Sequence, residues 1–301
     1  MDYQEVLKVI AKKDDSIIVM TSENMALIRD LPEVLKERFI DTGITEQTLI
    51  GSSAGLALMG KKPIVHALSA FLTMRAFEFI RTDIGISSAP VKLIGFIPGL
   101  LSDGNGPTHQ AIEDISLMRG IPNMDVFAPA DNEDLCIMLP EIIKTNRPAY
   151  IRANTNKGSF KHSNRYEVGQ PEVISEGNDV NILSYGILFE QAFLAMKELE
   201  ERGIKCNLIN LRSLKPINEE IILNSIEKCD LTVTIEDHFH VGGLFSIISE
   251  LLTTKNKTSK ILPINLGAEW FQTGKLEDII NYHGFSSKNI VKKILKELKK
   301  I

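Results

Sequence analysis

The sequence is poor in cysteine, and its three cysteines, Cys136, Cys206 and Cys229, are widely spaced. An odd number without metal-ligand spacing argues against a disulfide scaffold and a zinc site, and is typical of a reduced, cytoplasmic protein. An apolar run of membrane-spanning length is missing too. Residues 1–5 have neither the basic segment nor the apolar stretch of a secretory signal. We therefore expect a soluble, cytoplasmic protein.

An excess of positive charge is absent as well. The 301 residues carry a formal net charge of −5, and Lys and Arg are scattered until a lysine-rich tail at residues 293–300. Nucleic-acid-binding domains carry a basic patch or stripe, so we expect neither a nucleic acid nor a membrane as partner. Apolar residues at helical spacing in 290–298 instead predict a terminal amphipathic helix.

The sequence does contain a regular alternation of short apolar runs and helical patterns. This alternation predicts an α/β protein with two parallel-sheet domains, residues 1–153 and 179–301, joined by a polar, glycine-bearing linker at 154–178. The length of the chain fits two domains. The expected strands are 16–20, 63–67, 91–96, 124–128, 180–185, 205–209, 231–236 and 261–265, and the expected helices are 45–60, 71–84, 131–144 and 188–202.

Three short segments hold residues suited to chemistry. They are Asp41-Thr42-Gly43-Ile44-Thr45-Glu46-Gln47, Phe71-Leu72-Thr73-Met74-Arg75-Ala76-Phe77 and Gly106-Pro107-Thr108-His109-Gln110. Each key residue also has an ordinary interpretation: Glu46 as an acid in the first turn of a helix, Phe71 as core, His109 as a structural histidine. However, His109 ends a glycine-rich loop after a strand, where parallel α/β sheets place ligand-binding groups.

Together these segments resemble the pyrimidine-binding half of a thiamine-diphosphate enzyme of the transketolase family. The second half, with Thr234-Ile235-Glu236-Asp237-His238 followed by Gly242-Gly243, resembles the C-terminal domain of the same family. The resemblance implies a thiamine-diphosphate-binding (pyrimidine) fold followed by a transketolase C-terminal fold. It also implies transfer of a two-carbon ketol unit from a ketose to an aldehyde acceptor.

The resemblance assigns the cofactor side of the site. Glu46 would be the acid that hydrogen-bonds the aminopyrimidine of thiamine diphosphate and favours the tautomer that acts as an internal base. Apolar neighbours such as Ile44, Leu49 and Ile50 would help to keep that acid protonated. Phe71 would stack on the pyrimidine, with Phe77 as a weaker candidate.

It assigns the substrate side as well. His109 would contact the bound substrate as a proton shuttle or hydroxyl binder, and His66, after another strand, is a second candidate. Asn105 occupies a position where transketolases usually have an aspartate that recognises a sugar hydroxyl. Arg152 matches the family's phosphate-side arginine and predicts an anionic sugar, whereas Phe96-Ile97-Pro98 replaces a phosphate-binding histidine.

One family segment has no counterpart. Full-length transketolases hold the diphosphate and Mg²⁺ through a Gly-Asp-Gly run and a later Asn, and this sequence offers no such run and no candidate metal ligands. We therefore expect a split enzyme, in which a separate N-terminal transketolase subunit binds the diphosphate and Mg²⁺. A helix rich in small residues, 45–60, favours a subunit interface, and a heterotetramer in which this chain self-associates is expected.

Three other functions stay open at this point. A synthase of the deoxyxylulose-phosphate type is a close alternative. The β subunit of a 2-oxoacid dehydrogenase is another, and Gly-Pro-Thr-His-Gln argues against it because this segment resembles transketolases. A noncatalytic assembly subunit is the alternative from a different class, and the presence of Glu46, Phe71 and His109 argues against it.

Overall fold

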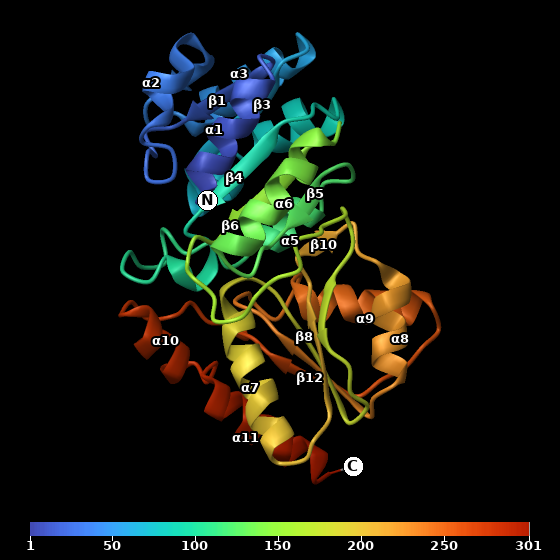
Figure 1. Cartoon of the computed structure of the whole chain (residues 1–301). Helices are drawn as coiled ribbons and strands as arrows, with labels where there is room; N and C mark the ends of the chain where they lie inside the picture. Colours follow the sequence, from blue (N-terminus) through green and yellow to red (C-terminus); the bar gives the residue numbers. More distant parts are fainter. Residues whose placement is uncertain (301) are drawn as a thin grey trace.

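The computed structural model describes residues 1–300 and contains two β-sheets, one above the other in Figure 1, each with helices on both faces. The first sheet has the strand order β10-β5-β6-β4-β3-β1-β2 and the second β12-β11-β8-β9-β7. Only the pairs β10 with β5 and β7 with β9 are antiparallel. The strands are β1 (Ile17–Thr21), β2 (Phe39–Asp41), β3 (Lys62–Leu68), β4 (Lys92–Phe96), β5 (Asp125–Phe127), β6 (Ala149–Ala153), β7 (Glu172–Ser175), β8 (Val180–Ser184), β9 (Cys206–Asn210), β10 (Ser213–Lys215), β11 (Leu231–Ile235) and β12 (Ile261–Ile264).

The first sheet is apolar on both faces. On β1, Ile17 and Val19 join one buried cluster and Ile18 and Met20 join the other, because successive side chains of a strand point to opposite faces. Helices α1, α2 and α6 cover the first of these faces, and α3, α4 and α5 cover the second. The helices are α1 (Tyr3–Lys13), α2 (Leu31–Leu35), α3 (Glu46–Leu58), α4 (Phe77–Phe79), α5 (Asp114–Arg119) and α6 (Asn132–Lys144).

The second sheet is covered in the same way. Helices α7 and α11 pack against each other on one face, and α8 and α9 lie on the other (Figure 1). The apolar cluster under α9 also includes Met118 and Ile121 of the first half, so the two halves share buried apolar surface. The helices are α7 (Phe189–Glu201), α8 (Glu219–Glu227), α9 (Leu244–Thr254), α10 (Leu276–Tyr282) and α11 (Ser287–Leu298). None of the helices within residues 1–300 has the length and apolar character needed to cross a membrane.

The predicted fold class is confirmed, and each expected strand overlaps an observed one. The helix expected at 71–84 is irregular instead. It consists of the π-helical segments Phe71–Arg75 and Ile80–Ile86 on either side of the single turn α4. Wide π turns inside helices occur frequently at functional sites, and they shift side chains away from the usual four-residue spacing.

The two halves are connected by more than a linker. The segment expected as a linker, 154–178, includes β7, which pairs with β9 in the second sheet. Strand β10 follows β9 in the chain but pairs with β5 in the first sheet, where Ser213 lies opposite Phe127. The second half therefore contributes an edge strand to the sheet of the first half.

A buried polar cluster lies beside this crossing. His162 Nδ1 lies 2.7 Å from Glu172 Oε2, and His162 Nε2 lies 3.1 Å from Asp131 Oδ2. Arg212 Nη2 lies 2.7 Å from Asp134 Oδ1 and 2.8 Å from Glu172 Oε2. Burial lowers the pKa of His162, but the hydrogen bonds to Asp131 and Glu172 outweigh it and raise that pKa to about 10. Because two cations already face the carboxylates of Asp134 and Glu172, we assign no metal site to this cluster.

The raised pKa of His162 predicts a loss of stability at alkaline pH. The folded-state pKa of about 10 exceeds the ordinary value of 6.5. The stabilisation is therefore complete below pH 6.5 and disappears as the pH rises to about 10. We expect the free energy of unfolding in urea to fall over this range more steeply in the wild type than in His162→Gln. Equal slopes in the two proteins would show that His162 is not protonated in the folded state.

Candidate active site

Glu46 is the first residue of α3, directly after the turn that follows β2. Gly43 in this turn has a φ of +68°, a left-handed conformation that glycine adopts without strain. The Glu46 side chain is almost completely buried, and only 2% of the residue is exposed. Leu49 and Ile50 are buried with it, as expected, whereas Ile44 is exposed. The carboxylate thus lies in apolar surroundings at the edge of the first sheet.

Phe71 and His109 lie beside this acid. Glu46 Oε2 accepts a hydrogen bond from Arg75 Nη1 at 3.0 Å, and the Arg75 guanidinium lies over the Phe71 ring at 4.0 Å from its centroid. The rings of Phe71 and His109 meet edge to face, with centroids 4.9 Å apart. Phe71 therefore connects three separate segments of the sequence: it lines one cavity with Glu46, and its ring contacts that of His109.

A cavity of about 420 Å³ opens at Glu46 and Phe71. One wall comes from the loop after β1, and the other residues belong to the start of α3 and the end of β3. The lining residues are Ser22, Glu23, Asn24, Met25, Ala26, Arg29, Ile44, Glu46, Leu68 and Phe71. An aromatic face and a buried carboxylate at one end of such a cavity fit a planar nitrogen heterocycle such as an aminopyrimidine. The Arg75 guanidinium covers one face of the Phe71 ring.

The loop that carries His109 is held by the second half. Gln110 Nε2 donates a hydrogen bond to Phe271 O at 2.8 Å, and Gly274 N donates one to Asp103 O at 3.1 Å. At the start of the loop, Gly99 has a φ of +56°, and a Cβ there would overlap the Asp237 carboxylate. His109 is half-buried, and its Nδ1 lies 2.9 Å from Thr108 Oγ1. The second half therefore fixes the position of the loop that reaches Phe71.

Arg152 is not placed to bind substrate. Its Nε donates to Asp114 Oδ2 at 2.9 Å and its Nη1 donates to Asp237 Oδ1 at 2.7 Å. Only 2% of the residue is exposed, and the guanidinium lies over the ring of Tyr185. Because two carboxylates already bind this buried guanidinium, the phosphate-side role expected for Arg152 is wrong for this structure. Arg152 instead joins the two halves.

His66 and Phe77 are also away from the cavity. His66 is buried on β3, where its Nε2 bonds the Tyr3 hydroxyl at 2.7 Å and its Nδ1 lies 3.3 Å from Met20 O. Burial lowers the pKa of His66 to about 4, so the ring is neutral. Phe77 lines a second hollow with Arg81, beyond the irregular helix. Neither residue lines the cavity at Glu46, and the expected roles of His66 toward the substrate and of Phe77 toward the cofactor stay predictions.

Asn105 is exposed in the loop before His109, four residues upstream of it. Its side chain is open to solvent in this chain, so its expected contact with a sugar hydroxyl stays a prediction.

Three polar residues near Glu46 were not predicted from the sequence. Arg75 follows Phe71 by four residues and contacts both Glu46 and the Phe71 ring. Asn24 and Arg29 lie in a loop some twenty residues before Glu46 and carry no motif. Only the fold brings that loop to the end of β3.

The comparisons with known proteins agree with this architecture. The family described as "Transketolase, pyrimidine binding domain" matches residues 2–159, and "Transketolase, C-terminal domain" matches residues 169–290. The chain therefore belongs to the transketolase family.

Several relatives match over most of their length. A putative transketolase C-terminal section of Methanocaldococcus jannaschii is 31% identical over 99% of this chain and 95% of its own. A 6-deoxy-6-sulfo-D-fructose transketolase subunit of a Clostridium species is 35% identical over 83% of this chain and 79% of its own. A solved structure described as a split gene transketolase, inactive beta4 tetramer, superposes with a TM-score of 0.90 at 31% identity, covering 99% of this chain and 97% of that one.

Proposed function

We propose that this chain is the pyrimidine-binding subunit of a split, thiamine-diphosphate-dependent transketolase that moves a two-carbon ketol unit from an anionic ketose to an aldehyde. The observation that carries the proposal is that the buried Glu46 and Phe71 line one cavity and that the His109 ring contacts the Phe71 ring. Full-length matches to split transketolase subunits support it.

When bound, thiamine diphosphate supplies a carbon nucleophile that cleaves and re-forms a bond next to a carbonyl. Glu46 would hydrogen-bond the aminopyrimidine of the cofactor and favour the tautomer that acts as an internal base. Phe71 would orient the heterocycle by stacking on it. His109, on the loop next to Phe71, binds or shuttles the proton of a substrate hydroxyl.

The diphosphate and Mg²⁺ are assigned to a partner subunit. In the part of the chain that the structure describes, the one group of candidate ligands is the cluster of Asp134, His162 and Glu172, which is buried far from solvent and already holds Arg212. This set does not fit a diphosphate-bound Mg²⁺, which requires open oxygen ligands.

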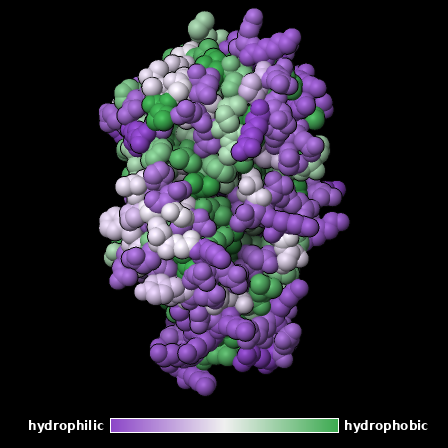
Figure 2. Space-filling view, turned by 90° about the vertical axis from the view of Figure 1, so that its left-hand side faces the viewer, coloured by the Kyte–Doolittle hydropathy of each residue, from purple (hydrophilic) through white to green (hydrophobic). Residues whose placement is uncertain are grey.

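Exposed apolar residues supply a surface for such a partner. Figure 2 shows hydrophobic residues along the middle of the face on which the loop 98–111 and α10 lie in Figure 1. Beside Glu46, the small residues Ser52 and Gly55 of α3 are exposed, and Leu58 and Met59 at its end are 72% and 81% exposed. Apolar surface of this kind is typical of interaction sites, which supports self-association and a heterotetramer.

The free cysteines support a reducing, cytoplasmic location.

The proposal predicts that the isolated chain binds cofactor weakly. We expect calorimetry with thiamine diphosphate and Mg²⁺ to show tight binding only when the partner is present, because this chain holds the pyrimidine side alone. Glu78→Gln in the mixed complex serves as the control, since Glu78 is exposed to solvent and does not line the cavity. Tight binding by the isolated wild-type chain would contradict the split-enzyme proposal.

A second candidate is a synthase of the deoxyxylulose-phosphate type. A 1-deoxy-D-xylulose-5-phosphate synthase of Dictyoglomus thermophilum is 36% identical over 88% of this chain, although this chain spans only 43% of that protein. Incubating the mixed complex with pyruvate or with a ketose donor, each with an aldehyde acceptor, separates the two. Product formation with pyruvate as the donor, and none with the ketose, would favour the synthase.

A further inference from the structure

Helices α7 and α11 enclose a hollow away from the candidate active site. They pack against each other on one face of the second sheet, at the lower end of the molecule in Figure 1, whereas Glu46 and Phe71 belong to the first half. The hollow has a volume of about 440 Å³. Its lining comprises Glu198 and Arg202 on the α7 side and six residues within 288–299 on the α11 side, and it is called the α7–α11 groove below.

The α7–α11 groove carries an unbalanced positive charge. Glu198 is the one carboxylate among the described residues that line it, and this carboxylate is paired with Arg202 at 2.6 Å. The chain as a whole has a net charge of −5, so the groove is opposite in sign to the rest of the molecule. Four further cations line the groove without an ion pair anywhere within residues 1–300, and these groove lysines are Lys288, Lys292, Lys296 and Lys299.

Other lysines on and near α11 do have partners in this chain. Lys293 Nζ donates a hydrogen bond to Gly284 O at 3.1 Å, and Lys300 is paired with Glu297 at 2.6 Å. The groove lysines instead recur at intervals of four, four and three residues, so they follow one side of the helix. Like charges at these intervals repel each other and destabilise a helix. An anionic group in the groove would remove this repulsion.

Apolar groups form the floor of the groove between these cations. Val291 and Leu295 line it one turn apart on α11, the first buried and the second half-buried. Lysine side chains add the methylene groups of their stems to apolar surface of this kind. An occupant that carries both carboxylates and apolar side chains therefore complements the groove better than an inorganic anion does.

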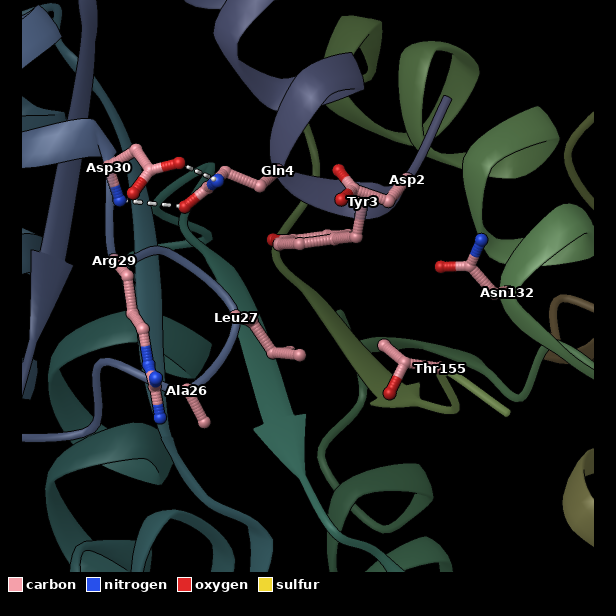
Figure 3. A pocket seen from close by; sticks show the side chains of 9 residues that line it. All are labelled: Asp2, Tyr3, Gln4, Ala26, Leu27, Arg29, Asp30, Asn132 and Thr155. Carbon is pink, nitrogen blue, oxygen red and sulfur yellow. Dashed lines mark hydrogen bonds between the residues drawn. The ribbon is translucent and has the colours of Figure 1, made fainter. Parts of the chain in front are cut away.

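A second polar hollow, at the start of α1, lacks this excess of one charge. Asp2, Arg29 and Asp30 are among the residues that line it (Figure 3). The Asp30 carboxylate accepts a hydrogen bond from Gln4 Nε2 at 2.9 Å, and Asp30 N donates one to Gln4 Oε1 at 2.8 Å. Acidic and basic groups are mixed there and part of the polar surface is already paired. Only the α7–α11 groove therefore indicates the class of its ligand.

The dimensions of the groove decide between anionic partners. The groove lysines span roughly 16 Å of helix. A nucleic acid would extend past this length onto a chain of net negative charge. A membrane requires an apolar face that can insert, but Ile290 and Ile294 of α11 are buried in the apolar cluster of the second half. A short helix of a partner protein matches the length, and it repeats its side chains at the same spacing as the lysines.

We propose that the α7–α11 groove is a docking site for an acidic amphipathic helix of a partner protein. Carboxylates three or four residues apart on that helix pair with the groove lysines, and the apolar side chains between them cover Val291 and Leu295. Complementary charges of this kind speed association and select the partner. The proposal does not depend on the transketolase function, because no residue that lines the cavity at Glu46 lines the groove.

The test measures the binding of a synthetic helical peptide to the full chain by fluorescence anisotropy at physiological salt. The probe has glutamates at intervals of three or four residues and leucines between them. The groove variant is Lys292→Gln with Lys296→Gln. The control is Lys8→Gln with Lys12→Gln, which removes two lysines at the same spacing from α1. We expect the Kd of the probe to rise about tenfold in the groove variant and to stay unchanged in the control.

Two further peptides separate docking from a general attraction between charges. One keeps every glutamate and has serines in place of the leucines. The other has the composition of the probe in a shuffled order that spreads the glutamates around the helix. We expect each to bind the wild type at least about tenfold more weakly than the probe. Equal affinity for the three peptides, an equal Kd in the groove variant and the control, or no binding of the probe to the wild type would overturn the proposal.

The same variants test the other classes of partner. The probes are a double-stranded DNA oligonucleotide and vesicles that contain phosphatidylserine, and we expect both to bind the wild type more weakly than the peptide. If either binds more tightly and loses this binding in the groove variant alone, the groove serves that partner and the proposal is overturned. The Tm of the groove variant serves as the check on folding. We expect it not to fall, because removing two lysines reduces the repulsion within α11.

Discussion

Glu46→Gln is expected to leave the mixed complex assembled and to lower its turnover at least about 100-fold, within the usual range for a general acid or base. Glutamine has the shape of the acid but cannot hold the proton that favours the reactive tautomer. Its amide also loses the ion pair in which Glu46 accepts from Arg75 at 3.0 Å. The measurement is kcat with the best ketose donor, with assembly followed by light scattering.

Glu78→Gln is the matched control, because Glu78 lies on the same irregular helix and is exposed to solvent. We expect it to retain full activity. NMR exchange of the cofactor C2 proton tests the role of Glu46 directly. A nearly normal exchange rate in the Glu46→Gln complex would show that another group supplies the acid.

Arg152→Met is expected to destabilise the fold by about 3–5 kcal/mol, as when one partner of a buried ion pair is removed. The substitution leaves Asp114 and Asp237 as two buried carboxylates without their shared cation. The free energy of unfolding in urea measures the effect. The control is Arg202→Met, which removes the exposed ion pair between Arg202 and Glu198 at the end of α7. We expect it to change the free energy of unfolding by less than about 1 kcal/mol.

The same variant separates the two roles considered for Arg152. A structural role predicts lower stability with little change in KM at temperatures where the variant is folded. If the variant is stable and its KM rises strongly for charged donors but not for uncharged ones, Arg152 binds the substrate. This result would contradict its assignment as a residue that joins the two halves.

The sequence was most informative where a role depends on neighbouring residues in the chain. Glu46, Phe71 and His109 each stand in a short motif, and the resemblance to the transketolase family assigns these motifs to one site. For that reason their meeting could be predicted without coordinates. The parallel sheets followed from apolar runs in the same way.

The errors arose where a role depends on distant partners. Arg152 occupies a position that resembles the family's anion-binding arginine, yet Asp114 and Asp237 approach it from segments 38 and 85 residues away in the chain. Local sequence cannot show that such carboxylates have already neutralised a cation. The π turns on either side of α4 interrupt the regular helix expected at 71–84, and no sequence pattern indicated them.

Strand β10 limits how this protein can be divided. A fragment ending near residue 160 would keep β5 but lose the strand that covers its edge, since β10 lies at 213–215. An uncovered edge strand is a template for pairing with other chains, so the isolated first half should aggregate on expression. Gene fusion to a partner is better placed at either end of the whole chain than between its two sheets.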